Sequence, residues 1–84
     1  MSANNDDPEL SHYRYFLLGR RLVRIGHNQD GNPYFSEFAN GETKQMEINN
    51  NYMMKIMFGD PDDLREMDEP EFAELCLQKG VKSR

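Results

Sequence analysis

Residues 33–48 read PYFSEFANGETKQMEI, and the pair Asn40-Gly41 lies between two segments rich in residues that form strands. A type I′ turn needs positive φ at both central residues, and Asn-Gly meets this need at low steric cost. The pattern therefore predicts a hairpin with a two-residue loop, in which a strand of about residues 33–39 pairs with one of about residues 42–48.

The two-residue loop also predicts which residues of this hairpin face each other. Phe35 would lie opposite Met46, and Glu37 would lie opposite Lys44. An apolar pair and an oppositely charged pair on one face both stabilise an antiparallel sheet. We therefore expect this register in the folded chain.

A second hairpin is predicted upstream, where Gly19-Arg20 provides a turn with glycine in its first position. It joins strands of about residues 13–18 and 21–26. This register places Phe16 opposite Val23, and an aromatic residue facing a β-branched one is a favourable cross-strand pair. A polar loop then leads to the strand that starts near residue 33.

The segment before Gly19 can also be interpreted as a helix. Asp7-Pro8-Glu9 combines a capping residue, proline at the first helical position and an acid in the first turn. A helix from Pro8 to Leu18 would then end at Gly19. The Tyr-Arg-Tyr-Phe composition of residues 13–16 favours the strand, but both alternatives fit the sequence.

A first helix is predicted at about residues 51–58, after a run of asparagines in which Asn50 or Asn51 can cap its N-terminus. Met53, Ile56 and Met57 recur at helical spacing and form one apolar stripe. Gly59 provides the stop. Other apolar residues lie off this stripe, so the helix serves either as core alone or as core and interface.

A second helix is predicted at about residues 69–79, with acids around Pro70 at its start and Gly80 at its end. Its buried stripe consists of Phe72, Leu75 and Cys76. Between the two helices, a single helical turn is expected at about residues 61–66.

These elements predict an α+β fold, with a small antiparallel sheet of three or four strands followed by two short helices on one sheet face. The 84 residues allow one domain, which we expect to span residues 8–80. Residues 1–7 are small and polar and are expected to form a disordered tail. Residues 81–84 are expected to form a frayed C-terminus.

The composition indicates a small, acidic, cytoplasmic protein. Cys76 is the single cysteine, so no intramolecular disulfide and no cysteine-rich zinc site can form. The N-terminus lacks the basic and apolar regions of a signal peptide, and no stretch has membrane-spanning length. We therefore expect no membrane association.

Charge is segregated along the chain, whose formal net charge is −5. Residues 60–74 contain eight acids against one base, Arg65. The predicted first hairpin carries the arginines Arg14, Arg20, Arg21 and Arg24. Such segregation indicates either solvated faces and internal ion pairs, or an acidic surface that recognises a basic partner.

No set of residues has the pattern of a catalytic or metal site. Cys76 lies on an apolar helix stripe, where a thiol is usually inert. The register of the first hairpin places His12 opposite His27, but a metal site needs three or four ligands. We expect two exposed histidines, no cofactor, no metal and no enzymatic activity.

The leading functional hypothesis is protein–protein interaction through the acidic segment and the methionine-rich helix beside it. An unidentified basic protein is the expected partner. The candidate partner-binding residues are Asp60, Asp62, Asp63, Glu66, Met54 and Phe58.

The alternative hypothesis is single-stranded nucleic-acid binding through aromatic and arginine side chains of the first strands. Bases stack on aromatic rings, and arginines bind phosphates. The candidate residues are Tyr13, Tyr15, Arg24 and Tyr34. The acidic balance of the whole domain argues against this hypothesis.

Overall fold

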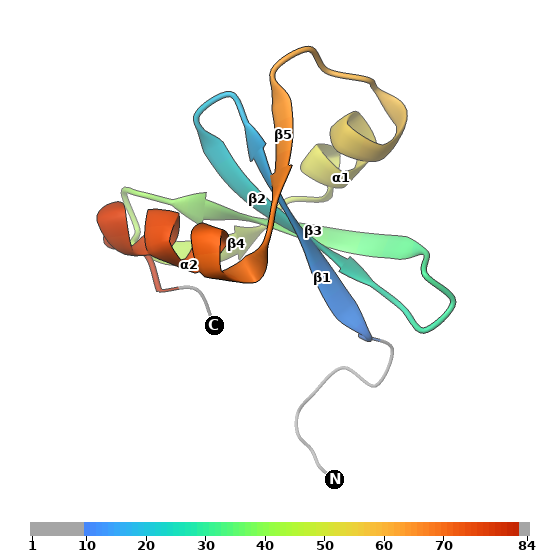
Figure 1. Ribbon diagram of the computed structural model, residues 1–84, viewed down its shortest axis with the longest axis horizontal. Helices are drawn as coiled ribbons and strands as arrows, with labels where there is room; N and C mark the ends of the chain where they lie inside the picture. The colour runs from blue at the N-terminus through green and yellow to red at the C-terminus, as the bar shows by residue number, and fades with distance from the viewer. Residues whose placement is uncertain (1–9, 83–84) are drawn as a thin grey trace, which may run out of the picture.

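The computed structural model describes residues 10–82, which form a five-stranded antiparallel sheet with one helix on each face. The strands are β1 (His12–Leu18), β2 (Arg21–His27), β3 (Pro33–Asn40), β4 (Gln45–Ile48) and β5 (Leu64–Met67), and the helices are α1 (Asn50–Phe58) and α2 (Glu69–Gln78). The strand order across the sheet is β4-β3-β2-β1-β5 (Figure 1). The predicted α+β class is confirmed, with five strands instead of three or four.

The first hairpin has the predicted register, with Phe16 opposite Val23. Gly19 has a φ of +61°, which glycine adopts without steric cost and the predicted turn requires. The helical alternative is wrong for residues 12–18, which form β1. Because β1 pairs with β2 on one side and β5 on the other, its strand conformation is fixed by two ladders.

The second hairpin forms, but its predicted two-residue loop and register are wrong. Met46 lies opposite Ala39 instead of Phe35, and residues 41–44 form the loop. The Asn40 side chain explains the longer turn, because its Oδ1 accepts hydrogen bonds from the amides of Glu42 and Thr43. The shift is an even number of residues, so each side chain keeps its predicted face.

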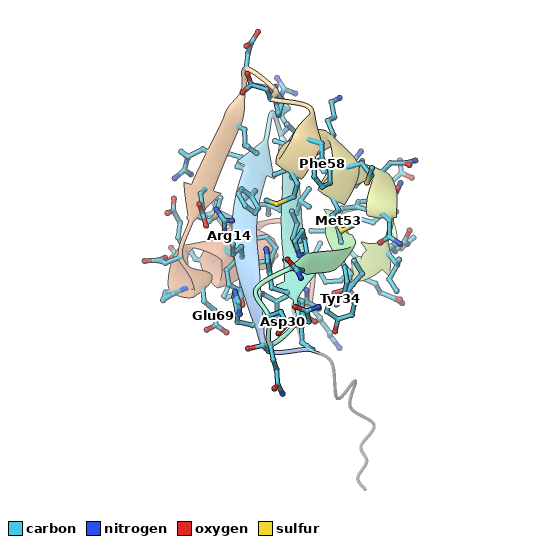
Figure 2. All side chains as sticks on the ribbon, turned by 90° about the vertical axis from the view of Figure 1, so that its right-hand side faces the viewer. Arg14, Asp30, Tyr34, Met53, Phe58 and Glu69 are labelled. Atoms are coloured by element: carbon cyan, nitrogen blue, oxygen red, sulfur yellow. The ribbon has the colours of Figure 1, made fainter. Side chains whose placement is uncertain are left out.

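The predicted placement of both helices on one sheet face is wrong. Ile56 of α1 packs against Phe16 and Val23, whereas Phe72 of α2 packs against Leu22 on the opposite face. Figure 2 shows the sheet between the two helices. Both faces need cover because β1 and β2 contain consecutive apolar residues, which point to alternate faces of a sheet.

β5 connects the two helical layers and was not predicted. Residues 64–66 lie within the segment expected to form a helical turn, and instead they pair with β1 as part of β5. The Gly19 amide donates to the Asp63 carbonyl just before the strand begins. β5 therefore lies at the sheet edge, and the chain passes along it from the α1 face to the α2 face (Figure 1).

The helix ends follow the predicted chemistry to within one residue. Asn49 caps α1 by accepting from the Asn51 amide, where Asn50 or Asn51 was the predicted cap. Asp68 caps α2 by accepting from the Glu71 amide. Gly80, with a φ of +75°, follows α2 as predicted.

The core extends beyond residue 80, where the domain was expected to end. Val81 is 2% exposed and packs with Cys76 in the cluster under α2. Lys82 forms a β-bridge with Gln45 of β4. Of the expected frayed segment, residues 83–84 lie outside the described part of the chain, as does the predicted tail of residues 1–7.

Candidate interaction surface

α1 is core on one side and exposed on the other. Ile56 is buried against the sheet, and Met53 and Met57 pack beside it as the predicted stripe. Met54 and Phe58 are 53% and 72% exposed. They lie four residues apart, so they are neighbours on one side of the helix. The helix therefore has an exposed apolar side as well as a buried one.

The acidic loop of residues 60–63 follows directly after α1. Asp60, Asp62 and Asp63 are all exposed. Asp60 has a φ of +53°, a conformation that aspartate tolerates better than most residues. The loop is anchored to the tip of the first hairpin by the 3.0 Å hydrogen bond from the Gly19 amide to the Asp63 carbonyl. The loop leads from the C-terminal end of α1 to the start of β5 (Figure 1).

Glu66 lies on β5, outside this loop, and forms an ion pair with Arg14 of β1. Its two carboxylate oxygens accept hydrogen bonds from Nε and Nη2 of Arg14, both at 2.8 Å. These hydrogen bonds lower the pKa of Glu66, and they raise the pKa of Arg14. The structure thus separates Glu66 from the other three candidate acids.

Other acids of the same run also have structural roles. Glu71 forms a 2.9 Å ion pair with Arg65, and Asp68 caps α2. The run of eight acids is therefore divided between β5, α2 and the loop, and does not form one continuous acidic surface. Asp60, Asp62 and Asp63 form no ion pair with any residue between 10 and 82.

The arginines of the first hairpin also contact partners within the domain. Arg24 forms a 2.8 Å ion pair with Glu37, and its guanidinium lies 4.4 Å from the centroid of the Tyr13 ring. Arg21 lies over the Phe38 ring at 4.8 Å. Of these arginines, Arg14 pairs with an acid of residues 60–74, whereas the partner of Arg24 lies on β3.

Three of the four residues proposed for nucleic-acid binding share one sheet face. Tyr13, Tyr15 and Arg24 lie on the face that α2 partly covers, and the Tyr15 ring packs 4.9 Å from Phe72. Tyr34 contacts the same aromatic group through Phe35, at 4.9 Å between ring centroids. Arg24, however, is 6% exposed and already paired with a carboxylate. The cluster thus has stacking rings, but its arginine does not face solvent.

The histidine pair forms as the register predicted, but His27 is buried and not exposed as expected. The rings of His12 and His27 stack with centroids 5.0 Å apart. Nδ1 of His27 lies 3.2 Å from the Ile25 carbonyl. Burial is the main cause that lowers the pKa of His27, and the nearby His12 and Arg14 lower it further. Within residues 10–82, no group of three potential ligands is placed to hold a metal ion.

Cys76 and Ser36 lie in the interior. Cys76 is buried beneath α2. Ser36 is also buried, where its hydroxyl donates to the Asn49 carbonyl and accepts from the Met53 amide. Both side chains thus contribute to packing or hydrogen bonding in the core.

Comparison of the chain with protein-family models, with curated proteins and with solved structures gave no match. No helix within the described part of the chain is long and apolar enough to cross a membrane. The functional proposal therefore depends on the shape, burial and charge of the residues described above.

Proposed function

We propose that the protein is a small non-enzymatic protein–protein interaction module. Its binding surface consists of Met54 and Phe58 on α1 together with Asp60, Asp62 and Asp63 in the loop that follows, and we call it the α1 surface. The observation that carries the proposal is the exposure of two large apolar side chains on α1, followed in the chain by three exposed aspartates that have no ion-pair partner among residues 10–82.

The chemistry of the α1 surface favours a basic partner that presents an apolar side chain. A large exposed apolar residue such as Phe58 stabilises a complex by about 1.5–3 kcal/mol if a partner buries it fully. The three carboxylates would attract lysine or arginine side chains and exclude acidic competitors. We therefore expect the apolar pair to supply affinity and the loop to supply specificity.

The α1 surface is also rigidly supported, which lowers the entropic cost of binding. The start of α1 is fixed to β3 by the hydrogen bonds of Ser36, and the loop is fixed to the first hairpin through Asp63. Glu66 is left out of the proposed surface because its carboxylate is paired with Arg14.

A comparison of matched variants tests the proposal. Proteins carrying Met54→Ser with Phe58→Ser, or Asp62→Lys with Asp63→Lys, are used to capture partners from native host extract, and captured proteins are quantified by mass spectrometry. Leu77→Ser is the control, because Leu77 is 75% exposed but lies on α2, on the opposite sheet face.

The proposal predicts a defined set of basic proteins that both double variants fail to capture and that Leu77→Ser still captures. Equal capture by all three variants, or loss only in Leu77→Ser, would contradict it. The soluble yield and thermal unfolding of each variant are measured first, since these exposed substitutions should leave the fold intact.

Single-stranded nucleic-acid binding is the second candidate, supported by the shared face of Tyr13 and Tyr15. The ion pair of Arg24 with Glu37 weakens it, because phosphate binding would have to compete with a carboxylate. A titration of short RNA and DNA at low salt, followed by tyrosine fluorescence, tests this function. Saturable quenching that Tyr13→Ala abolishes would favour it over the α1 surface.

A further inference from the structure

An apolar groove lies on the other side of the molecule, between α2 and the first hairpin. It has a volume of about 320 Å³ and is lined by Leu17, Leu22, Leu75, Gln78 and Lys79. Leu17 and Leu22 lie directly opposite each other in the β1–β2 ladder and form its floor. The groove shares no residue with the α1 surface.

The groove exists because α2 covers only part of its sheet face. Phe72 and Cys76 point into the core and are fully buried, whereas Leu75, at the side of the helix, is half-buried. Leu17 on the floor is also half-buried. Apolar carbon is therefore open to solvent between helix and hairpin, and filling such a space with another apolar group is favourable.

The rim of the groove is cationic. From Leu75 to Lys82 the chain carries two lysines and no acid, because the acids of α2 all precede Leu75. Lys79 lines the groove, and Nζ of Lys44 donates to the Lys79 carbonyl at 3.3 Å. A second ammonium group thus lies beside the end of the helix.

A helix C-terminus normally repels anions, but here the carbonyls of Cys76 and Leu77 are already paired. The Gly80 amide donates to the Leu77 carbonyl and the Val81 amide donates to the Cys76 carbonyl, at 3.0 and 2.9 Å. These bonds are those of a Schellman motif. These two carbonyls are therefore paired within the chain, and Lys79 supplies an ammonium group for an anion at this rim.

We propose that this groove binds a single-chain anionic amphiphile, namely a free medium-chain fatty-acid carboxylate. The alkyl chain lies along Leu17, Leu22 and Leu75, and the carboxylate pairs with Lys79. The volume is at the low end of the range of roughly 300–1,000 Å³ for small-molecule sites, which fits one alkyl chain. Leu77 lies about 200° around the helix from Leu75. It therefore does not enlarge the apolar surface of the groove, as an interface with a protein partner would require.

The proposal is tested on the full-length protein by following backbone amide NMR signals during titration. The probes are decanoate, decanol and decyltrimethylammonium, which share the alkyl chain and differ in charge. Decanoate should give saturable shifts centred on the groove-lining residues, at lower concentration than decanol. Decyltrimethylammonium should bind more weakly than decanol, because Lys79 repels it.

Two pairs of matched variants separate the contributions of charge and apolar wall. Lys79→Gln should weaken decanoate binding about two- to five-fold, the range for an exposed ion pair, and leave decanol binding unchanged. Lys55→Gln, on α1, should change neither. Leu75→Gln places an amide in the wall and should weaken both probes, whereas Leu77→Gln should weaken neither. An unchanged dispersion of amide signals shows that each variant is folded.

Four outcomes would overturn the proposal. They are no saturable shifts at millimolar decanoate, shifts centred on Met54 and Phe58, equal binding of all three probes, and binding to anionic phospholipid vesicles without binding to free decanoate. Failure of this proposal would not contradict capture by the α1 surface, because the two sites share no residue.

Discussion

Ser36 of β3 and Asn49 before α1 hold each other through two hydrogen bonds. The Ser36 hydroxyl donates to the Asn49 carbonyl at 2.6 Å, and the Asn49 amide donates to the Ser36 carbonyl at 2.9 Å. The same hydroxyl accepts from the Met53 amide at 3.0 Å, and the Ser36 amide donates to Oδ1 of Asn50 at 3.0 Å. One small buried side chain thus fixes the position at which α1 begins.

Replacing Ser36 with alanine should therefore destabilise the domain out of proportion to the single oxygen removed. The Asn49 carbonyl and the Met53 amide would both lose a partner in a buried setting, which costs about 1–3 kcal/mol. Urea unfolding measures the loss. Ser11→Ala, at an exposed position, is the matched control and should lie within about 0.5 kcal/mol of the parent. Equal stability of the two variants would contradict this role of Ser36.

Gly26→Ala should destabilise the sheet through a steric clash. A Cβ atom at Gly26 would overlap with Cε1 of Phe35 on the neighbouring strand. Overpacking of this kind costs about 1–3 kcal/mol. Gly41→Ala is the matched control, since its Cβ would meet nothing within 4 Å. Adding Phe35→Leu to Gly26→Ala should restore part of the loss in thermal unfolding, and failure to do so would argue against the clash.

His27 should make the domain less stable as the pH falls below about 6.5, the usual pKa of histidine. Burial lowers the pKa of His27 in the folded state, so the unfolded chain binds the proton more readily. Stability is then lost between the unfolded and the folded pKa. Urea unfolding at pH 5–8 should show this decline, and His27→Gln should flatten it.

The NMR titration of the two histidine rings provides an independent check of the same prediction. The His27 ring should titrate at lower pH than an unperturbed histidine. A pH-independent stability between 5 and 8, or a His27 titration above that of a model peptide, would contradict the assignment.

The two arginine–glutamate pairs of the sheet should differ in their contribution to stability. The side chains of Arg24 and Glu37 are 7% and 17% exposed, so Glu37→Gln should cost about 2–3 kcal/mol, somewhat below the range for fully buried pairs. Arg14 and Glu66 are about half exposed, so Glu66→Gln should cost less than about 1 kcal/mol. Urea unfolding at neutral pH compares the variants, and equal losses would contradict this ranking.

The ion pair of Arg14 with Glu66 should instead be detected through the loss of stability at acidic pH. The pKa of Glu66 is lowered in the fold, so its contribution is complete above the unfolded pKa and is lost as the pH falls below about 4.5 towards the folded value. Glu66→Gln should remove this part of the acid sensitivity. An identical acid profile for parent and variant would show that the pair contributes nothing.

The first hairpin could be predicted down to its residue pairs because the residues that determine its turn and register lie close together in the sequence. Gly19-Arg20 defines the turn, and the apolar residues on either side fit only one register. The turn after Asn40 was predicted too short because the propensity of Asn-Gly takes no account of the Asn40 side chain. That side chain bonds two further amides and stabilises the longer loop.

β5 could not be predicted because its own sequence, Leu-Arg-Glu-Met, has weak strand propensity. Its conformation is imposed by pairing with β1, which lies far upstream in the chain. The same distance hid the pairing of Arg14 with Glu66, which are 52 residues apart. Without β5, no connection was foreseen that carries the chain from one sheet face to the other between the two helices.

The proposed surfaces were predictable to different degrees. Phe58 lies off the apolar stripe of its helix, and this spacing left open whether the helix is core alone or core and interface. The groove beside α2 was not predictable, because its floor comes from the first hairpin and its wall from the last helix. Such a juxtaposition exists only in the folded domain.

The edge position of β5 has a consequence for how the protein is made. β1 is the first strand to leave the ribosome, yet its outer edge receives a partner only when residues 64–67 have been synthesised. Until then the nascent chain presents an open strand edge to which other chains can add. A product truncated before residue 64 should therefore aggregate, and cellular quality control would have to recognise and remove it.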